Sequence, residues 1–134
     1  MASELVKVPS GNIKPFGTAS PNGVPPATIR QAYGVNLASF GSIVGDGTGQ
    51  TIAIVDAFDL PTIASDLAAF DAYDVLPDPR SFTKVNQTGG NALPSANAKG
   101  GWGVKIALDV HWAHVMALKA NILLVEANSA TFAN

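Results

Sequence analysis

The sequence contains no cysteine and few charged residues, and both shortages narrow the functions open to it. Without cysteine, neither disulfides nor thiolate metal sites contribute to the fold. Charged residues are 13% of the 134 residues, against about 25% in a typical soluble domain, while apolar residues make up 47%. The net charge of −2 comes without any cluster of lysine or arginine, so we expect no nucleic-acid partner. Such low charge suits a chain whose faces are covered, by itself or by a partner.

Long apolar segments are missing as well. The best apolar run of strand type, residues 122–125, is far shorter than the roughly 18 residues of a membrane span. The first residues also lack the apolar core of a signal peptide. We therefore expect no membrane partner, and the compartment stays unknown.

The order of the segments predicts one α/β domain preceded by an extended arm. Residues 1–26 hold five of the nine prolines and are predicted to form the N-terminal arm, and residues 27–134 the domain. The β-branched apolar run at 51–56 is typical of a strand covered on both faces. The remaining pattern predicts a short helix at 26–33, a helix capped by Asp59 and ending near Tyr73, a weaker strand at 82–88, a helix at 103–118 and a strong strand at 121–127. This β-α-β-α-β order predicts a three-stranded parallel sheet with helices on its faces and right-handed crossovers.

Residues 100–114 carry the most informative pattern in the chain. They read Gly-Gly-Trp-Gly-Val-Lys-Ile-Ala-Leu-Asp-Val-His-Trp-Ala-His and resemble the helix that carries the acidic pair of the sedolisin (serine-carboxyl) peptidases, a branch of the subtilisin-like clan. Three more segments are similar to the start of a sedolisin catalytic domain: the opening helix at 26–34, the first core strand at 49–59 and the strand after the acidic helix at 120–127. The likeness spans residues 24–130 and implies a truncated subtilisin-like sheet, the first part of a larger catalytic domain.

The resemblance also implies a set of catalytic positions, and this chain departs from it. In the family a Glu acts as general base toward a Ser, an Asp one turn later supports the Glu, and a further Asp lines the oxyanion site. Asp109 stands at the Asp position, but Lys105 stands at the Glu position. A charged lysine cannot accept a proton, and Asp109 one turn away is expected to raise its pKa. The same two residues are also expected to form an ordinary i,i+4 ion pair on the helix surface.

The other parts of the family's catalytic site have no counterpart in this sequence. The family's Ser lies in a Gly-Thr-Ser sequence, which this chain does not contain. The family's oxyanion Asp and calcium site also belong to later parts of the catalytic domain, so no cofactor is expected here. We therefore expect a chain that is inactive by itself and whose remaining role is binding a peptide or protein, or self-assembly into a homo-oligomer.

Two alternatives remain open. In the first, the chain is an acid-pH serine endopeptidase that is active when a C-terminal half complements it or when it is part of a longer parent. The resemblance also implies secretion, because the family is typically secreted. In the second, the Lys105 amine carries out a reaction of its own, with Asp109 and His111 nearby.

A few further residues are candidate site residues. Trp102 either lines a peptide groove or anchors the start of its helix, and His111 is a candidate binding residue. His111 and His114 are three positions apart, but with no third ligand nearby we expect no metal site. Asp56 and Asp59 follow the first strand at its carboxyl end, where ligands gather in open α/β sheets, yet both are expected to be turn or capping residues.

Self-association is expected from the helix at 103–118 and from the strand edges. Ile106, Val110, Ala113 and Ala117 form one apolar face of that helix. Leu108, Val115 and Leu118 add apolar surface elsewhere, so the helix is expected to be covered on more than one side. A strand at the edge of the partial sheet offers unpaired backbone groups to a second copy.

Overall fold

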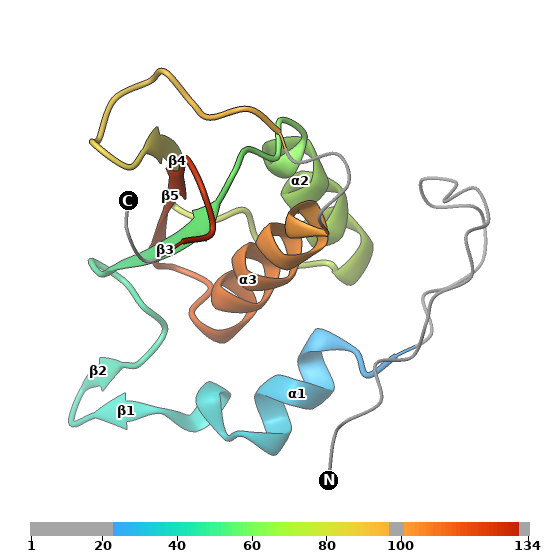
Figure 1. The fold of residues 1–134 in the computed structure, drawn as a ribbon. Helices are drawn as coiled ribbons and strands as arrows, with labels where there is room; N and C mark the ends of the chain where they lie inside the picture. Colours follow the sequence, from blue (N-terminus) through green and yellow to red (C-terminus); the bar gives the residue numbers. More distant parts are fainter. Residues whose placement is uncertain (1–22, 97–100, 132–134) are drawn as a thin grey trace, which may run out of the picture.

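The computed structural model describes residues 23–96 and 101–131 (Figure 1). The predicted arm lies almost wholly at residues 1–22, outside the described residues. The described elements are, in order, α1 (Pro26–Ala32), a 3₁₀ turn (Val35–Leu37), the short strands β1 (Ser39–Phe40) and β2 (Ile43–Val44), β3 (Thr51–Ala57), α2 (Ile63–Asp74), β4 (Ser81–Asn86), α3 (Trp102–Met116) and β5 (Asn121–Ala127).

The three longer strands form one parallel sheet in the order β3-β5-β4. β5, the last strand in sequence, is therefore the central strand, and β3 and β4 lie at the two edges. β1 and β2 pair with each other as a separate antiparallel hairpin. The predicted α/β class and the parallel β-α-β-α-β arrangement are confirmed.

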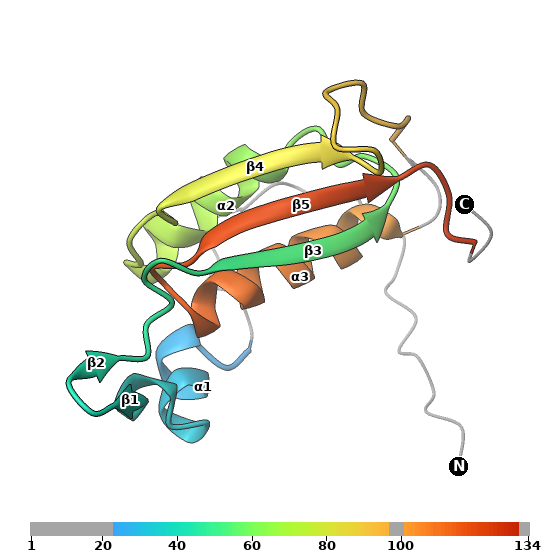
Figure 2. The same ribbon diagram turned by 90° about the vertical axis from the view of Figure 1, so that its left-hand side faces the viewer.

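Both long helices pack on the same face of the sheet (Figure 2). The core cluster joins Ile63 and Leu67 of α2 and Ile106 and Val110 of α3 to a single face of β5, that of Ile122 and Leu124. The expectation of helices on more than one face is wrong for the described residues.

This placement also corrects the prediction of right-handed crossovers. The chain crosses from β3 to β4 through α2 and then returns from β4 to β5 through α3. The two crossovers run in opposite directions while both helices lie on one face, so they have opposite hands and one of them is left-handed. Since about 98% of such connections are right-handed, the left-handed crossover is a rare feature.

The second face of the sheet is open in the described part of the chain. Residues of β3 alternate in burial, with Ile52 and Ile54 turned toward the helices and Ala53 and Val55 exposed. Val55 keeps 70% of its surface accessible. The prediction that this strand is covered on both faces is therefore wrong here.

Local sequence sets the ends of the helices. Thr62, rather than the predicted Asp59, occupies the N-cap position of α2, and its hydroxyl donates a hydrogen bond to the Asp66 carboxylate at 2.8 Å. α2 ends where Val75 adopts a left-handed conformation, with φ of 56°. α3 follows Gly101, whose φ of 76° suits glycine.

The surface of α3 is covered on one side and exposed on another. Ile106, Val110 and Val115 are fully buried, whereas Leu108 and Val104 remain more than half exposed. The Arg30 side chain donates a hydrogen bond to the Val115 carbonyl and so attaches α1 to the end of α3. Among the described residues, no helix is both long enough and apolar enough to cross a membrane.

Candidate functional site at the carboxyl edge of the sheet

The helix-facing side of the sheet changes from apolar to polar at the carboxyl ends of the strands. Near the amino ends, register places Ile52, Ile122 and Phe82 side by side. At the carboxyl ends the matching row consists of Asp56, Glu126 and Asn86. The carboxyl edge is where open parallel sheets bind ligands, so this row marks the candidate site.

The first charged cluster of this edge joins β3 to α3. The Lys105 ammonium contacts the Asp109 carboxylate one turn along α3, and its Nζ lies 3.7 Å from Asp56 Oδ1. The expected i,i+4 ion pair is therefore present. Asp56 is buried within β3 rather than in a turn or cap, so the expectation for Asp56 is wrong. The structure thus brings a third carboxyl to the Lys105–Asp109 pair.

The electrostatics of this cluster keep Lys105 protonated. Its hydrogen bond to Asp109 raises the pKa of Lys105, burial lowers it, and the nearby Asp56 charge raises it again, for a net upward shift. Burial, followed by the Asp109 charge, raises the pKa of Asp56, and Lys105 partly counteracts both. Asp56 Oδ2 is buried without a hydrogen-bond partner. The cluster thus favours an ammonium at position 105 and resists a full negative charge on Asp56.

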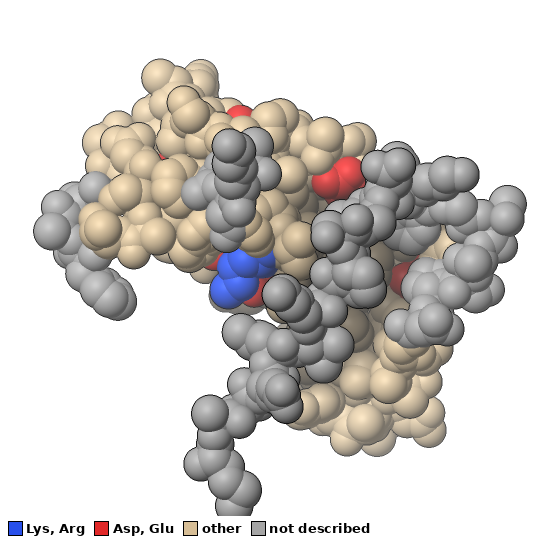
Figure 3. All heavy atoms as spheres, turned by 45° about the vertical axis from the view of Figure 1, so that its right-hand side comes forward, with Lys and Arg blue, Asp and Glu red and all other residues tan. Residues whose placement is uncertain are grey.

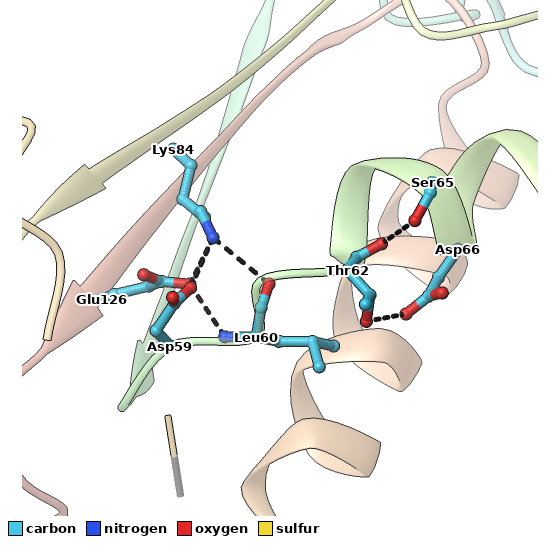
Figure 4. A network of polar contacts seen from close by, with 7 residues as sticks. All are labelled: Asp59, Leu60, Thr62, Ser65, Asp66, Lys84 and Glu126. Atoms are coloured by element: carbon cyan, nitrogen blue, oxygen red, sulfur yellow. Dashed lines mark hydrogen bonds and ion pairs between the residues drawn. The ribbon is translucent and has the colours of Figure 1, made fainter. Parts of the chain in front are cut away.

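A second charged cluster lies across the same edge (Figure 4). The Lys84 ammonium of β4 bonds the Asp59 carboxylate, donates to the Leu60 carbonyl at 3.2 Å, and lies 3.6 Å from Glu126 Oε1. The Leu60 amide donates to Glu126 Oε1 at 3.4 Å. Asp59 is thus an ion-pair partner and not the helix cap that its place before the helix suggested.

Glu126 is the most perturbed carboxyl of the site. Its side chain is fully buried, and burial raises its pKa to about 7 against the lowering effect of Lys84, while a hydrogen bond with Asp59 raises it further. Neither Lys84 nor Glu126 was recognised from the sequence. The usable signal was the strand alternation itself, which puts both residues on the helix-facing side after apolar positions.

Trp102 anchors the start of α3, the second of its two predicted roles. It is the first residue of the helix, and its ring meets the Phe58 ring edge-on at a centroid distance of 6.3 Å. Phe58 itself has a φ of 67°, an uncommon conformation for a residue with a side chain. This contact fixes the loop after β3 against the helix that carries Lys105.

His111 lies away from the Lys105 cluster. Its ring stacks on Phe70 of α2, with centroids 4.5 Å apart and planes within 10°. Burial lowers the pKa of His111, and its Nε2 is buried without a hydrogen-bond partner. The structure therefore does not bring His111 to Lys105 and Asp109.

His114 is fully buried and is part of the packing between helices. Its Nε2 lies 2.8 Å from the Pro77 carbonyl oxygen and 3.4 Å from Asp71 Oδ1. Within residues 23–96 and 101–131, no group of three or more His, Asp or Glu side chains is arranged to hold a metal ion.

The surface carries little charge and has a hollow at the end of the sheet far from the clusters. On the face shown in Figure 3, lysine and arginine atoms form one small group with acidic atoms beside it, and a few other acidic atoms lie apart from this group among uncharged residues. A mainly apolar pocket of about 400 Å³ lies at the amino edge, lined by residues of the β1–β2 hairpin, the turn before β3 and the segment after α3. The pocket and the charged clusters are thus at opposite ends of the strands.

Comparison with models of known protein families, with curated proteins and with solved structures found no match to this chain. The family resemblance therefore rests on the sequence segments that carry it.

Proposed function

We propose that this chain is part of a sedolisin-like, and so subtilisin-like, peptidase domain in which the acidic helix does not support catalysis and whose role is binding or self-assembly. The observation that carries the proposal is the position of the Lys105 ammonium, which is held by Asp109 and faces Asp56. The resemblance places a general base at position 105, and the chain holds a cation there.

The chemistry of this cluster argues against proton abstraction. A base must be unprotonated at working pH, and the contacts of Lys105 favour its charged form. The same contacts argue against Lys105 as a nucleophilic amine, because that role needs a lowered lysine pKa. The sequence also contains no Gly-Thr-Ser to supply the nucleophile that the resemblance implies.

The role in binding or self-assembly is supported by the uncovered part of the sheet. Val55 and Ala53 of β3 are exposed, and on β5 the same face bears Leu123 and Val125, which are partly exposed. Within the described residues β3 and β4 each pair with β5 alone, so each has one edge without a strand partner. Such edges and apolar faces are templates for a second copy or for an extended peptide.

A peptidase assay tests the catalytic part of the proposal. The unaltered chain and Lys105→Glu are each incubated with internally quenched peptides from pH 3 to 7, alone and with the C-terminal half of a sedolisin catalytic domain. Lys105→Met is the matched control, since it removes the charge without adding a carboxylate. The proposal predicts no hydrolysis by the unaltered chain, alone or mixed. Hydrolysis by the unaltered chain under either condition would contradict it.

The same assay decides the alternative of an active complemented peptidase. If the alternative is right, Lys105→Glu mixed with the C-terminal half cleaves the peptides at acid pH, whereas Lys105→Met does not. Absence of cleavage in the Lys105→Glu mixture rejects the alternative.

A further inference from the structure

The second cluster holds one loop through three ionisable side chains, Asp59, Lys84 and Glu126. Residues 58–62 connect β3 to α2, and Asp59 and Leu60 of this loop meet Lys84 and Glu126 (Figure 4). Lys84 bonds both the Asp59 carboxylate and the Leu60 carbonyl, while Glu126 accepts a hydrogen bond from the Leu60 amide. The loop is therefore held to β4 and β5 through polar contacts.

The loop in turn positions the rest of the carboxyl edge. The Asp59 amide donates to the Ser95 carbonyl at 3.4 Å, and Asp59 forms an isolated parallel bridge with Ala96. Phe58, one residue earlier, contacts Trp102 at the start of α3. A change in the position of the loop therefore changes the surroundings of the 95–96 segment and of the first turn of α3.

The charges around Glu126 balance only when Glu126 is neutral. Lys84 faces it from β4 and Asp59 from the loop. From β3, Asp56 is its register neighbour, and the charges on α3, Lys105 and Asp109, act on Asp56. With Glu126 protonated, the Lys84 ammonium faces the single negative charge of Asp59, and Glu126 shares a hydrogen bond with Asp59 that ionisation removes. Ionisation strengthens the bond from the Leu60 amide and the attraction of Lys84, but burial and Asp59 together oppose it more strongly, so the net effect raises the pKa of Glu126.

Ionised Glu126 leaves the cluster with an uncompensated charge in a buried place. Two carboxylates then share one ammonium, and Glu126 Oε2 has no hydrogen-bond partner. An unpaired buried charge is costly and favours either protonation or movement toward water. The loop is the part of the cluster able to move, since Glu126 lies in the central strand and Lys84 in an edge strand of the same sheet.

We propose that Asp59, Lys84 and Glu126 form a pH-sensitive latch that holds the loop at 58–62 against the sheet while Glu126 is protonated and loosens it when Glu126 ionises. The latch places the carboxyl edge, including the start of α3, under control of pH. The pKa of Glu126, about 7, puts the transition near neutrality.

Hydrogen–deuterium exchange of the backbone amides tests the latch. Exchange is followed at pH 5.5 and 8.5, corrected for the intrinsic pH dependence of exchange, in the unaltered chain and in Glu126→Gln. We expect protection of Asp59 and Leu60 to fall by about tenfold or more at pH 8.5 in the unaltered chain, because one unit of lost proton affinity is a factor of ten. Glu126→Gln, a neutral mimic of the protonated acid, is expected to keep equal protection at both pH values.

Equal protection of the unaltered chain at both pH values would overturn the proposal, and so would a Glu126→Gln variant that loses protection in the same way. A second measurement does not depend on the folding of any variant. The ¹³C resonance of the Glu126 carboxyl in the unaltered chain is titrated by NMR, with an expected midpoint of about 7. A midpoint at the ordinary glutamate value of 4.5 would also overturn it.

Discussion

Lys105 sits at the contact between α3 and β3, with Asp109 on its own helix and Asp56 on the strand. About half of the Lys105 side chain is exposed, whereas Asp56 is almost completely buried. The exposed ion pair with Asp109 contributes little to stability by itself, because solvent screens it. Lys105 also favours ionisation of the buried Asp56 carboxyl, against the larger opposing effects of burial and of the Asp109 charge.

Two substitutions of Lys105 are predicted to separate the effect of its ion pair with Asp109 from the effect of adding a carboxyl beside Asp56. Lys105→Met is expected to change the free energy of unfolding at pH 7 by no more than about 1 kcal/mol, since the pair is exposed. Lys105→Glu places three carboxyls together and is expected to cost roughly 1–3 kcal/mol at pH 7, and less at pH 4 where protons neutralise them. Urea denaturation at both pH values measures this. A Lys105→Glu cost, relative to the unaltered chain, that is the same at both pH values would contradict the assigned geometry.

At the scale of the element, the turn before β3 depends on Gly47. Its φ is 87°, and a Cβ added there would lie 2.9 Å from the Ala120 side chain and 3.0 Å from that of Ala117. The Lys119 amide donates to the Asp46 carbonyl at 2.9 Å in the same place. The turn and the segment after α3 therefore approach too closely for any side chain at position 47.

Gly47→Ala is predicted to be more destabilising than Gly49→Ala. Gly49 has a similar φ of 77° but open space where its Cβ would lie, so it controls for backbone strain alone. We expect a cost of about 1 kcal/mol for Gly49→Ala and roughly 1–3 kcal/mol more for Gly47→Ala, from overpacking. Thermal or urea denaturation gives both values, and equal costs would contradict the close approach at Gly47.

The elements also show what sequence patterns reveal and what they do not. The apolar runs at residues 51–56 and 121–127 predicted β3 and β5, because a buried strand needs β-branched and apolar side chains whatever its neighbours are. The exposure of Val55 was not predictable, because an apolar run does not tell whether a second layer covers it. The predicted hand of the crossovers was wrong for a related reason, since the hand depends on the face of the sheet against which each helix packs.

The part of the candidate site that the sequence did not predict depends on which strands are neighbours in the sheet. Lys105 and Asp109 were found because they lie one turn apart on one helix, where spacing determines contact. Glu126 meets Asp59 and Lys84 only through the strand order β3-β5-β4, which the local pattern does not contain.

At the scale of the whole molecule, buried carboxyls set the response to pH. Burial is the main cause of a raised pKa for Asp56, Asp71 and Glu126. A carboxyl with a raised folded-state pKa stabilises fully below its unfolded pKa, and that stability is lost as pH rises through the folded value. For Glu126 the window runs from 4.5 to about 7. The lowered pKa of His111 acts in the opposite direction below 6.5.

The contribution of Glu126 to the pH dependence of stability is predicted as the difference in unfolding free energy between the unaltered chain and Glu126→Gln. The effect of His111 is common to both and cancels in this difference. Relative to the variant, the unaltered chain is expected to lose roughly 3 kcal/mol of unfolding free energy between pH 4.5 and 8, at about 1.4 kcal/mol per pKa unit. Urea denaturation across this range measures the difference. A difference that stays constant with pH would show that Glu126 titrates normally in the folded state.

The open face and the strand edges make self-association the central expectation for the whole molecule. Its most direct test is the solution mass by light scattering during gel filtration, over a range of concentrations. We predict a dimer or larger assembly whose share rises with concentration. Val55→Lys on the open face should shift it toward monomer, while Val104→Lys, on an exposed part of α3, should not. A monomer at every concentration would contradict the account and leave the carboxyl edge, rather than a second copy, as the place to seek a ligand.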